Sequence, residues 1–194
     1  MSVDIREVIR SIPGPLSHLE SQTLADLASE TDATRALEVG HYLGLSTSLL
    51  LLGFPPEVEF TTIDHHKGDF WCPATSFDEF MANVEPFVGA RRFTPIDRDM
   101  ADALPKLDGR FGFVFYDADH KKAAVAEFWS HAADLMDDQC TLVFDDADWD
   151  DQSTLRRFAE ADGFEVVTGR ELWRAERRDK GHPDTYTLEI MRRG

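Results

Sequence analysis

The sequence predicts an α/β protein: a mostly parallel sheet of seven strands, covered by helices on both faces, with an antiparallel hairpin strand at the C-terminus. Two features of the 194 residues lead to this expectation. Short apolar runs alternate with longer stretches whose apolar residues recur at helical spacing, which is typical of parallel sheets built through right-handed crossovers. Only a polar segment, residues 169–184, separates the last two apolar runs, so these two strands are expected to pair antiparallel.

Seven segments have the composition of strands, being rich in β-branched and aromatic residues. Most of them end on a glycine or an aspartate, which marks the point where the chain leaves the sheet. In chain order they are RALEVG (35–40), VEFTTID (58–64), RRFTPID (91–97), FGFVFYD (111–117), CTLVFDD (140–146), FEVVTG (164–169) and DTYTLEIM (184–191).

The stretches between these strands have apolar residues at helical spacing. Ahead of the first strand, residues 1–34 are expected to form a helical segment that packs on the core, with an amphipathic helix over 15–30. No linker, repeat or low-complexity tract divides the chain, so residues 1–194 are expected to form a single domain. The other predicted helices are LSTSLLLLGF (45–54), FDEFMANVEPFV (77–88), DMADALPKL (99–107), KKAAVAEFWSHAADLM (121–136) and DQSTLRRFAEAD (151–162).

Charge and composition exclude several classes of partner. The net charge of −17 and the pI near 4.6 describe a surface that repels phosphate backbones, so nucleic acid is not expected to bind. The longest apolar stretch is too short to cross a bilayer, and MSVDIREVIR lacks the pattern of a secretion signal. We therefore expect a cytoplasmic protein without a membrane partner. Two cysteines, Cys72 and Cys140, are too few for a disulfide framework or a zinc site.

The first strand runs into ALEVGHYLGLSTS, where Glu38, Gly40, Gly44 and Ser46 precede a helix. Small residues at the carboxyl end of a parallel strand let the backbone approach a nucleotide closely. An acid before the glycines would repel a pyrophosphate but suits a cationic ligand. The second strand ends on Asp64, about twenty residues further on, where a carboxylate binds a ribose diol. The alternative is a simple tight turn, although a glutamate inside an apolar run is costly unless it has a function.

The segments E-V-G-x-x-x-G-x-S and T-I-D-H-H resemble motif I and the following acidic strand end of class I S-adenosylmethionine-dependent methyltransferases. The resemblance covers about residues 35–191 and implies a Rossmann-like fold with S-adenosyl-L-methionine as cofactor. NAD binding uses the same strand order and is the competing interpretation. The resemblance implies that the cofactor is bound by Glu38 and Gly40 at its methionine portion, Asp64 at the ribose, His65, Arg98 and Asp99 near the adenine, and also by Gly44, Ser46 and Asp117.

Acidic residues end two strands that are expected to be neighbours in the sheet. Asp117 follows the fourth strand, and Asp145 and Asp146 follow the fifth. Carboxyl ends of parallel strands meet at one edge, so these side chains should converge. Like charges at close range raise each other's pKa, and a hard divalent cation with oxygen ligands relieves the repulsion.

The same residues resemble a subset of the methyltransferases. D-A-D-H (117–120) and D-D (145–146) are similar to the D-A-D-K and D-N of catechol and caffeoyl-CoA O-methyltransferases, and to the paired acids of macrocin-type enzymes. The resemblance implies that Asp117, Asp145 and Asp146 bind Mg²⁺, with Mn²⁺ or Ca²⁺ as alternatives, although Asp146 replaces the asparagine of the first group. Many methyltransferases without a metal also carry D-A-D-H here, with the aspartate near the methionine end of the cofactor.

The predicted function is therefore metal-assisted O-methylation of a small-molecule hydroxyl, on a phenol, catechol or sugar in a biosynthetic pathway. His120 is the predicted base that takes the hydroxyl proton. A catalytically silent cofactor-binding scaffold or regulatory subunit, or a non-methylating metal-dependent enzyme on the same fold, are the alternatives. Aromatic residues on predicted loops, or a partner subunit in a homodimer, could complete the acceptor site; these aromatics are Phe70, Trp71, Trp149 and Trp173.

Overall fold

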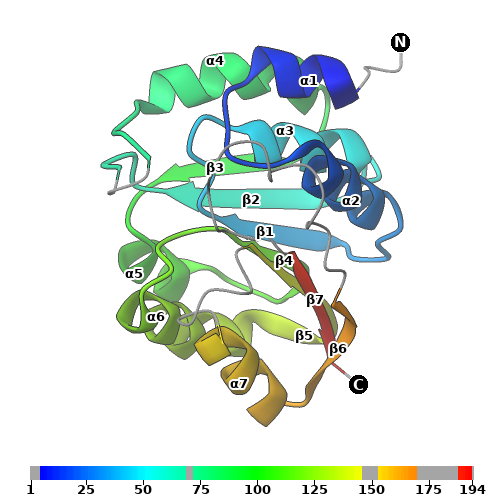
Figure 1. Ribbon diagram of the computed structural model, residues 1–194, viewed down its shortest axis with the longest axis vertical. Coiled ribbons are helices and arrows are strands. Elements are labelled where there is room, and N and C mark those ends of the chain that lie inside the picture. Colours follow the sequence, from blue (N-terminus) through cyan, green and yellow to red (C-terminus); the bar gives the residue numbers. More distant parts are fainter. Residues whose placement is uncertain (1–4, 69–71, 146–152, 170–187, 194) are drawn as a thin grey trace, which may run out of the picture.

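A single mixed sheet forms the centre of the computed structural model, which describes residues 5–68, 72–145, 153–169 and 188–193. Within these residues the sheet has seven strands in the order β3-β2-β1-β4-β5-β7-β6 (Figure 1). The strands are β1 (Arg35–Val39), β2 (Glu59–Asp64), β3 (Phe93–Asp97), β4 (Phe111–Tyr116), β5 (Met136–Phe144), β6 (Phe164–Gly169) and β7 (Glu189–Arg193).

The strands from β1 to β5 pair in parallel, whereas β7 runs antiparallel to both β5 and β6. This arrangement confirms the predicted fold class, including the antiparallel strand at the C-terminus. The order reverses between β1 and β4, so the crevice of the fold lies at the carboxyl ends of these two strands.

Helices cover both faces of the sheet (Figure 1). Apolar residues of the first four helices pack with Ala36 of β1 on one face, and those of the last three pack with Leu37 and Val39 on the other. Alternation along β1 therefore turns Glu38 toward the first face, beneath α3. The helices are α1 (Ile5–Ser11), α2 (His18–Ser29), α3 (Leu45–Gly53), α4 (Phe77–Val88), α5 (Met100–Ala103), α6 (Lys122–Ala132) and α7 (Ser153–Ala161), with short 3₁₀ turns η1 (Leu104–Lys106) and η2 (Ala133–Leu135).

Helix α4 has the predicted bounds because both of its ends carry strong local signals. The Ser76 hydroxyl accepts the Glu79 N–H at the start, and the Glu79 carboxylate accepts the Ser76 N–H in return. Gly89 follows the last helical residue with φ of +58°, a conformation that glycine adopts without a steric penalty. The helix lays Phe80 and Val84 into the core beside the carboxyl end of β1.

Two predicted helices have the wrong bounds. The helix expected over 99–107 divides into α5 and η1 next to Pro105, because proline cannot continue an α-helical hydrogen-bond ladder. The helix expected over 121–136 ends earlier, and β5 instead begins at Met136, which is buried and pairs with Phe111. Helix α1 lies within residues 1–34, which were expected to be helical, and its Val8 belongs to the buried core. Residues 184–187 of the last predicted strand lie outside the described ranges.

Candidate active site

A cavity of about 720 Å³ opens at the carboxyl ends of β1, β2, β4 and β5. Its wall includes a segment that sequence reasoning did not single out, the turn of residues 13–16 between α1 and α2. The predicted site residues that line this one cavity are Gly40, Ser46, Asp64, His65, Arg98, Asp99, Asp117, His120 and Asp145. Of the remaining predicted residues, Glu38 and Gly44 lie behind the wall, and Asp146 lies outside the described residues.

The glycine loop, residues 40–44, joins β1 to α3 and depends on glycine at both ends. Gly40 has φ of +91°, and a Cβ atom there would collide with the backbone carbonyl of Asp117. Gly44 also has φ of +91°, caps α3, and packs against Val84 of α4. Gly40 therefore brings β1 and β4 together at the cavity, while Gly44 closes the turn into the helix.

Glu38 of β1 is fully buried and is not among the residues that line the cavity. Its Oε2 atom accepts hydrogen bonds from Thr47 of α3 at 2.6 Å and from Thr62 of β2 at 2.8 Å. Its Oε1 atom has no hydrogen-bond partner among the described residues. Burial raises the pKa of Glu38 to about 7, and the hydroxyl groups of Ser46, Thr47 and Thr62 offset this only partly. Any effect of this carboxyl group on a cavity ligand is therefore indirect.

Asp64 organises the backbone of the two loops at its end of the cavity. Its Oδ2 accepts the N–H groups of His41 at 2.9 Å and Tyr42 at 2.8 Å, and its Oδ1 accepts that of His66 at 2.9 Å. Burial opposes ionisation of Asp64, yet its pKa is held below its usual range, and the three backbone donors contribute to this. Three of the four lone-pair positions on this carboxylate are thus occupied by the protein itself.

Two buried histidines, His41 and His66, meet beside Asp64 and line the cavity, and sequence reasoning assigned a role to neither. Their Nε2 atoms lie 3.1 Å apart, His41 Nδ1 lies 2.7 Å from the Thr62 hydroxyl, and His66 Nδ1 lies 3.0 Å from the Thr75 hydroxyl. The His41 ring also stacks on Phe80 at 3.8 Å. The only hint in the sequence is that each histidine closely follows a strand end of neighbouring strands, in V-G-H and D-H-H.

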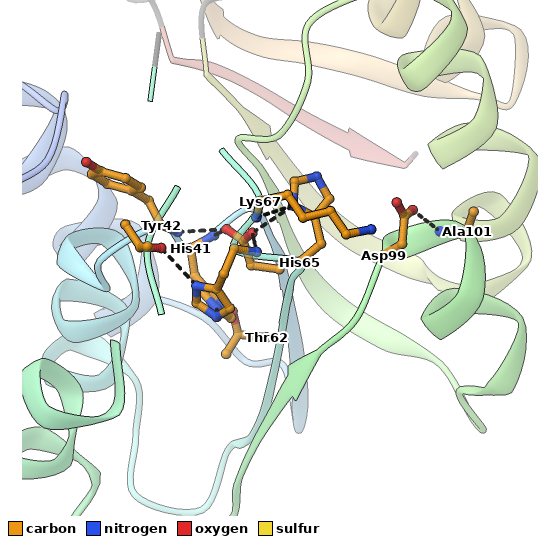
Figure 2. Close-up of polar contacts among 10 residues, drawn as sticks. His41, Tyr42, Thr62, His65, Lys67, Asp99 and Ala101 are labelled. Carbon is orange, nitrogen blue, oxygen red and sulfur yellow. Dashed lines mark hydrogen bonds and ion pairs between the residues drawn. The ribbon is translucent and has the colours of Figure 1, made fainter. Parts of the chain in front are cut away.

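The residues predicted near the adenine surround the mouth of the cavity beyond Asp64. His65 is partly exposed, and its Nδ1 accepts the Lys67 N–H at 3.0 Å (Figure 2). The Arg98 N–H donates to the Asp64 carbonyl at 2.8 Å, which holds the loop after β3 against β2. Asp99 caps α5 by accepting the Ala101 N–H at 3.1 Å, as Figure 2 also shows.

On the opposite side, Asp117 and His120 lie on the loop between β4 and α6. The Asp117 N–H donates to the Val39 carbonyl at 2.9 Å, which extends the pairing of β4 with β1 to the cavity. The buried Tyr116 donates its hydroxyl to the Asp119 carbonyl at 2.7 Å and thereby anchors the middle of the loop. Burial alone would raise the pKa of the Asp119 carboxyl, but hydrogen bonds from Lys121 lower it overall. The Asp119 carboxylate is thus engaged locally.

Two of the three predicted metal ligands lie at the cavity. Asp117 and Asp145 both line the cavity, because the Asp145 N–H bonds to the Tyr116 carbonyl and places β5 beside β4 at this edge. The third predicted ligand, Asp146, lies outside the described residues. Within the described ranges, no group of three histidine, cysteine, aspartate or glutamate side chains is arranged to hold a metal ion. The described residues alone therefore do not make a metal centre.

Two further observations concern the predicted surroundings of the site. The aromatic residues expected to line the acceptor space, which are Phe70, Trp71, Trp149 and Trp173, lie outside the described residues. Among the helices that the structure describes, none has both the length and the apolar character required to cross a bilayer.

Several solved structures, two of them named O-methyltransferases, have the same fold as this chain. Rv0187 from MTB, in a cofactor-bound structure, is 20% identical with a TM-score of 0.67, covering 97% of this chain and 85% of its own. The O-methyltransferase from Bacillus cereus, bound to S-adenosylhomocysteine, is 19% identical with a TM-score of 0.65. The match covers 97% of this chain and 89% of the Bacillus cereus chain. The O-methyltransferase TomG from Streptomyces achromogenes, bound to S-adenosylmethionine, is 20% identical with a TM-score of 0.59. The match covers 92% of this chain and 80% of the TomG chain.

Sequence comparison gives a more specific result than these structural likenesses. No curated protein matches the sequence significantly. Residues 37–147, more than half of the chain, match the methyltransferase domain family. This range begins in β1, ahead of the glycine loop, and extends past the end of β5, so it contains both strand ends at which the predicted acidic residues lie. The chain belongs to the methyltransferase domain family.

Proposed function

We propose that the protein transfers the methyl group of S-adenosylmethionine to a hydroxyl group of a small molecule. The observation that carries the proposal is the single cavity that joins the glycine loop and Asp64 on one side to His120 on the other. Its volume of about 720 Å³ is within the range of sites that hold a cofactor and a small acceptor. The O-methyltransferases of the same fold that are bound to S-adenosylhomocysteine or S-adenosylmethionine support this use of the cavity.

The cofactor is proposed to lie across the carboxyl ends of β2, β1 and β4. Its adenosine would occupy the side of Asp64 and Asp99, where one lone-pair position of the Asp64 carboxylate remains for a ribose hydroxyl. Its methionine portion would lie along Gly40, which lines the cavity. The positive sulfonium would then face Asp117, a favourable charge pairing in a partly enclosed site.

The acceptor is proposed to lie between the sulfonium and His120. The imidazole takes the hydroxyl proton while the acceptor oxygen attacks the methyl carbon from the side opposite sulfur. A new carbon–oxygen bond forms, the carbon–sulfur bond breaks, and its electron pair leaves the sulfonium as a neutral thioether. Holding both partners in one cavity supplies much of the acceleration, because the reaction becomes effectively unimolecular.

A divalent cation is proposed as an assisting group rather than a required one. Asp117, Asp145 and Asp146 are the residues that would hold it, and it would act as a Lewis acid that lowers the pKa of the acceptor hydroxyl. Only the first two of these residues are described, and both line the cavity. The proton transfer to His120 is chemically complete without the ion.

The decisive experiment combines cofactor binding with methyl transfer. Calorimetric titration with S-adenosylhomocysteine is expected to give saturable binding, and labelled S-adenosylmethionine is expected to methylate at least one phenol, catechol or sugar of a panel. His120→Ala should lower kcat by about 100-fold or more, whereas His18→Ala, on the exposed start of α2, should not change it. Failure to bind the cofactor would refute the proposal, and binding without turnover over a broad panel would favour a silent scaffold. Parallel assays with EDTA and with added Mg²⁺ test the metal.

A further inference from the structure

We propose that His41 and His66 are positioning residues whose shared hydrogen bond locks the glycine loop to the loop after β2, and so holds Asp64 in its cofactor-binding geometry. The pair is the centre of a buried chain of contacts that runs from Thr75 to Glu38. The link to cofactor affinity rests on the function proposed above. The hydrogen-bond arrangement itself does not.

We call the hydrogen bonds that link Thr75, His66, His41, Thr62 and Glu38 the relay. The donor and acceptor of each bond follow from the chemistry of the groups that it joins. Thr62 donates its one hydroxyl hydrogen to Glu38, so its oxygen must accept from His41 Nδ1–H. The other nitrogen of a neutral His41 ring is then an acceptor, and His66 must carry its hydrogen on Nε2. His66 Nδ1 consequently accepts from the Thr75 hydroxyl. Each imidazole is thereby assigned one tautomer.

The surroundings keep the His41 ring neutral and hold both rings in place. His41 is 2% exposed and His66 8% exposed. His41 stacks on Phe80, and His66 contacts the edges of Phe77 and Phe80. The charged group facing the pair is Asp64, yet burial lowers the pKa of His41 to about 3. A proton on His41 Nε2 would set two N–H groups against each other across 3.1 Å, which also opposes a charged His41.

The relay matters because the loops that it joins are strained. Tyr42 and His66 are the two non-glycine residues with positive φ in the described part of the chain, at +44° and +53°. Each costs about 1 kcal/mol in this conformation, and the N–H of each bonds to Asp64. Without the contact between the imidazoles, both residues could relax to negative φ and Asp64 would lose its donors. Weaker cofactor binding with little change in kcat at saturating cofactor is the expected result.

The tautomers are testable in the free protein by long-range ¹H–¹⁵N spectra of the imidazole rings. His41 is expected as the Nδ1–H form and His66 as the Nε2–H form. Thr62→Val removes the acceptor of His41 and should mix its tautomers. Thr47→Val, which removes the other hydroxyl donor to Glu38 without touching the relay, should leave them unchanged. The reverse tautomers in the wild type, or equal mixing in both variants, would overturn the relay.

The positioning role is tested by two replacements of His66 with matched volume. His66→Gln keeps an amide donor near the position of Nε2, whereas His66→Leu keeps only the bulk. We expect the dissociation constant of S-adenosylhomocysteine to rise about tenfold in the leucine variant, and by less than about threefold in the glutamine variant, as for loss or retention of one hydrogen bond. Equal affinities of the two variants, at equal circular dichroism, would refute the role. If the wild type bound no S-adenosylhomocysteine, the proposed function would be refuted. The imidazole spectra would still show whether His41 and His66 have the tautomers that the relay requires.

Discussion

Replacing Glu38 with glutamine is expected to stabilise the protein above neutral pH. The wild-type carboxyl is fully buried, its Oε2 atom accepts from the hydroxyl groups of Thr47 and Thr62, and the Ser46 hydroxyl is a further donor. Glutamine has nearly the same shape as the protonated acid, and its carbonyl can accept the same two hydrogen bonds. Its amide would then occupy the place of Oε1, which has no partner among the described residues in the wild type either.

The magnitude follows from the pKa of Glu38. Burial raises this pKa from the usual 4.5 to about 7. Because the folded protein binds the proton more tightly than the unfolded chain does, stability is fully present below the lower value and is lost as the pH rises through the higher one. At about 1.4 kcal/mol for each pH unit, the ionised carboxylate costs about 3 kcal/mol of the free energy of unfolding. Glutamine does not ionise and avoids this cost.

The assay is urea unfolding of both proteins at several pH values. At about pH 8 the Glu38→Gln variant should be more stable by about 2–3 kcal/mol, and at about pH 5 the difference should fall below about 1 kcal/mol. Glu85→Gln, at an exposed position on α4, removes the same charge without burial and should change stability by less than about 0.5 kcal/mol at either pH. Parallel curves for the wild type and Glu38→Gln would refute the reasoning, because they would mean that Glu38 has an ordinary pKa.

Two other predictions test the cavity edge. Gly40→Ala should destabilise the fold by about 3 kcal/mol or more in thermal unfolding and abolish binding of S-adenosylhomocysteine, since the new methyl group collides with the Asp117 carbonyl. The control is Gly163→Ala, at a glycine with φ of +85° and open space around it. In the same assay this control measures the backbone cost alone, about 1–2 kcal/mol. Tyr116→Phe should lower kcat severalfold with an unchanged KM for S-adenosylmethionine, because the loop before His120 loses its 2.7 Å anchor; an unchanged kcat would show that the anchor is dispensable.

Local patterns were sufficient to predict most of the sheet and its helices. The strand at residues 35–40 and the helix at 77–88 were found because the pattern of apolar residues lies within the segment itself. The start of β5 was missed because Met136 is followed by polar residues, and it is pairing with Phe111 that makes this stretch a strand. Propensity cannot anticipate such a partner from another strand.

The candidate site could be predicted only where a residue acts alone. Gly40 and Asp64 were found because a glycine or an acid at a strand end has a recognisable meaning. The role of Glu38 needed Thr47 and Thr62, which come from α3 and from the neighbouring strand. The pairing of His41 with His66 depends on the register of β1 against β2 and on the packing of α4, and neither of these is visible in a single segment.

The non-glycine residues with positive φ in the described part of the chain lie at one end of one cavity. Both non-glycine residues with positive φ in the described ranges, Tyr42 and His66, adjoin Asp64, and the buried carboxyl of Glu38 lies directly behind. Strain and buried charge of several kcal/mol persist only where surrounding contacts enforce them. Here the enforcing contacts are hydrogen bonds to Asp64, the residue proposed to hold the ribose. A sequence selected for stability alone would be expected to have these loops without residues at positive φ. The conformational strain of Tyr42 and His66 therefore indicates that the fold preserves the geometry of Asp64.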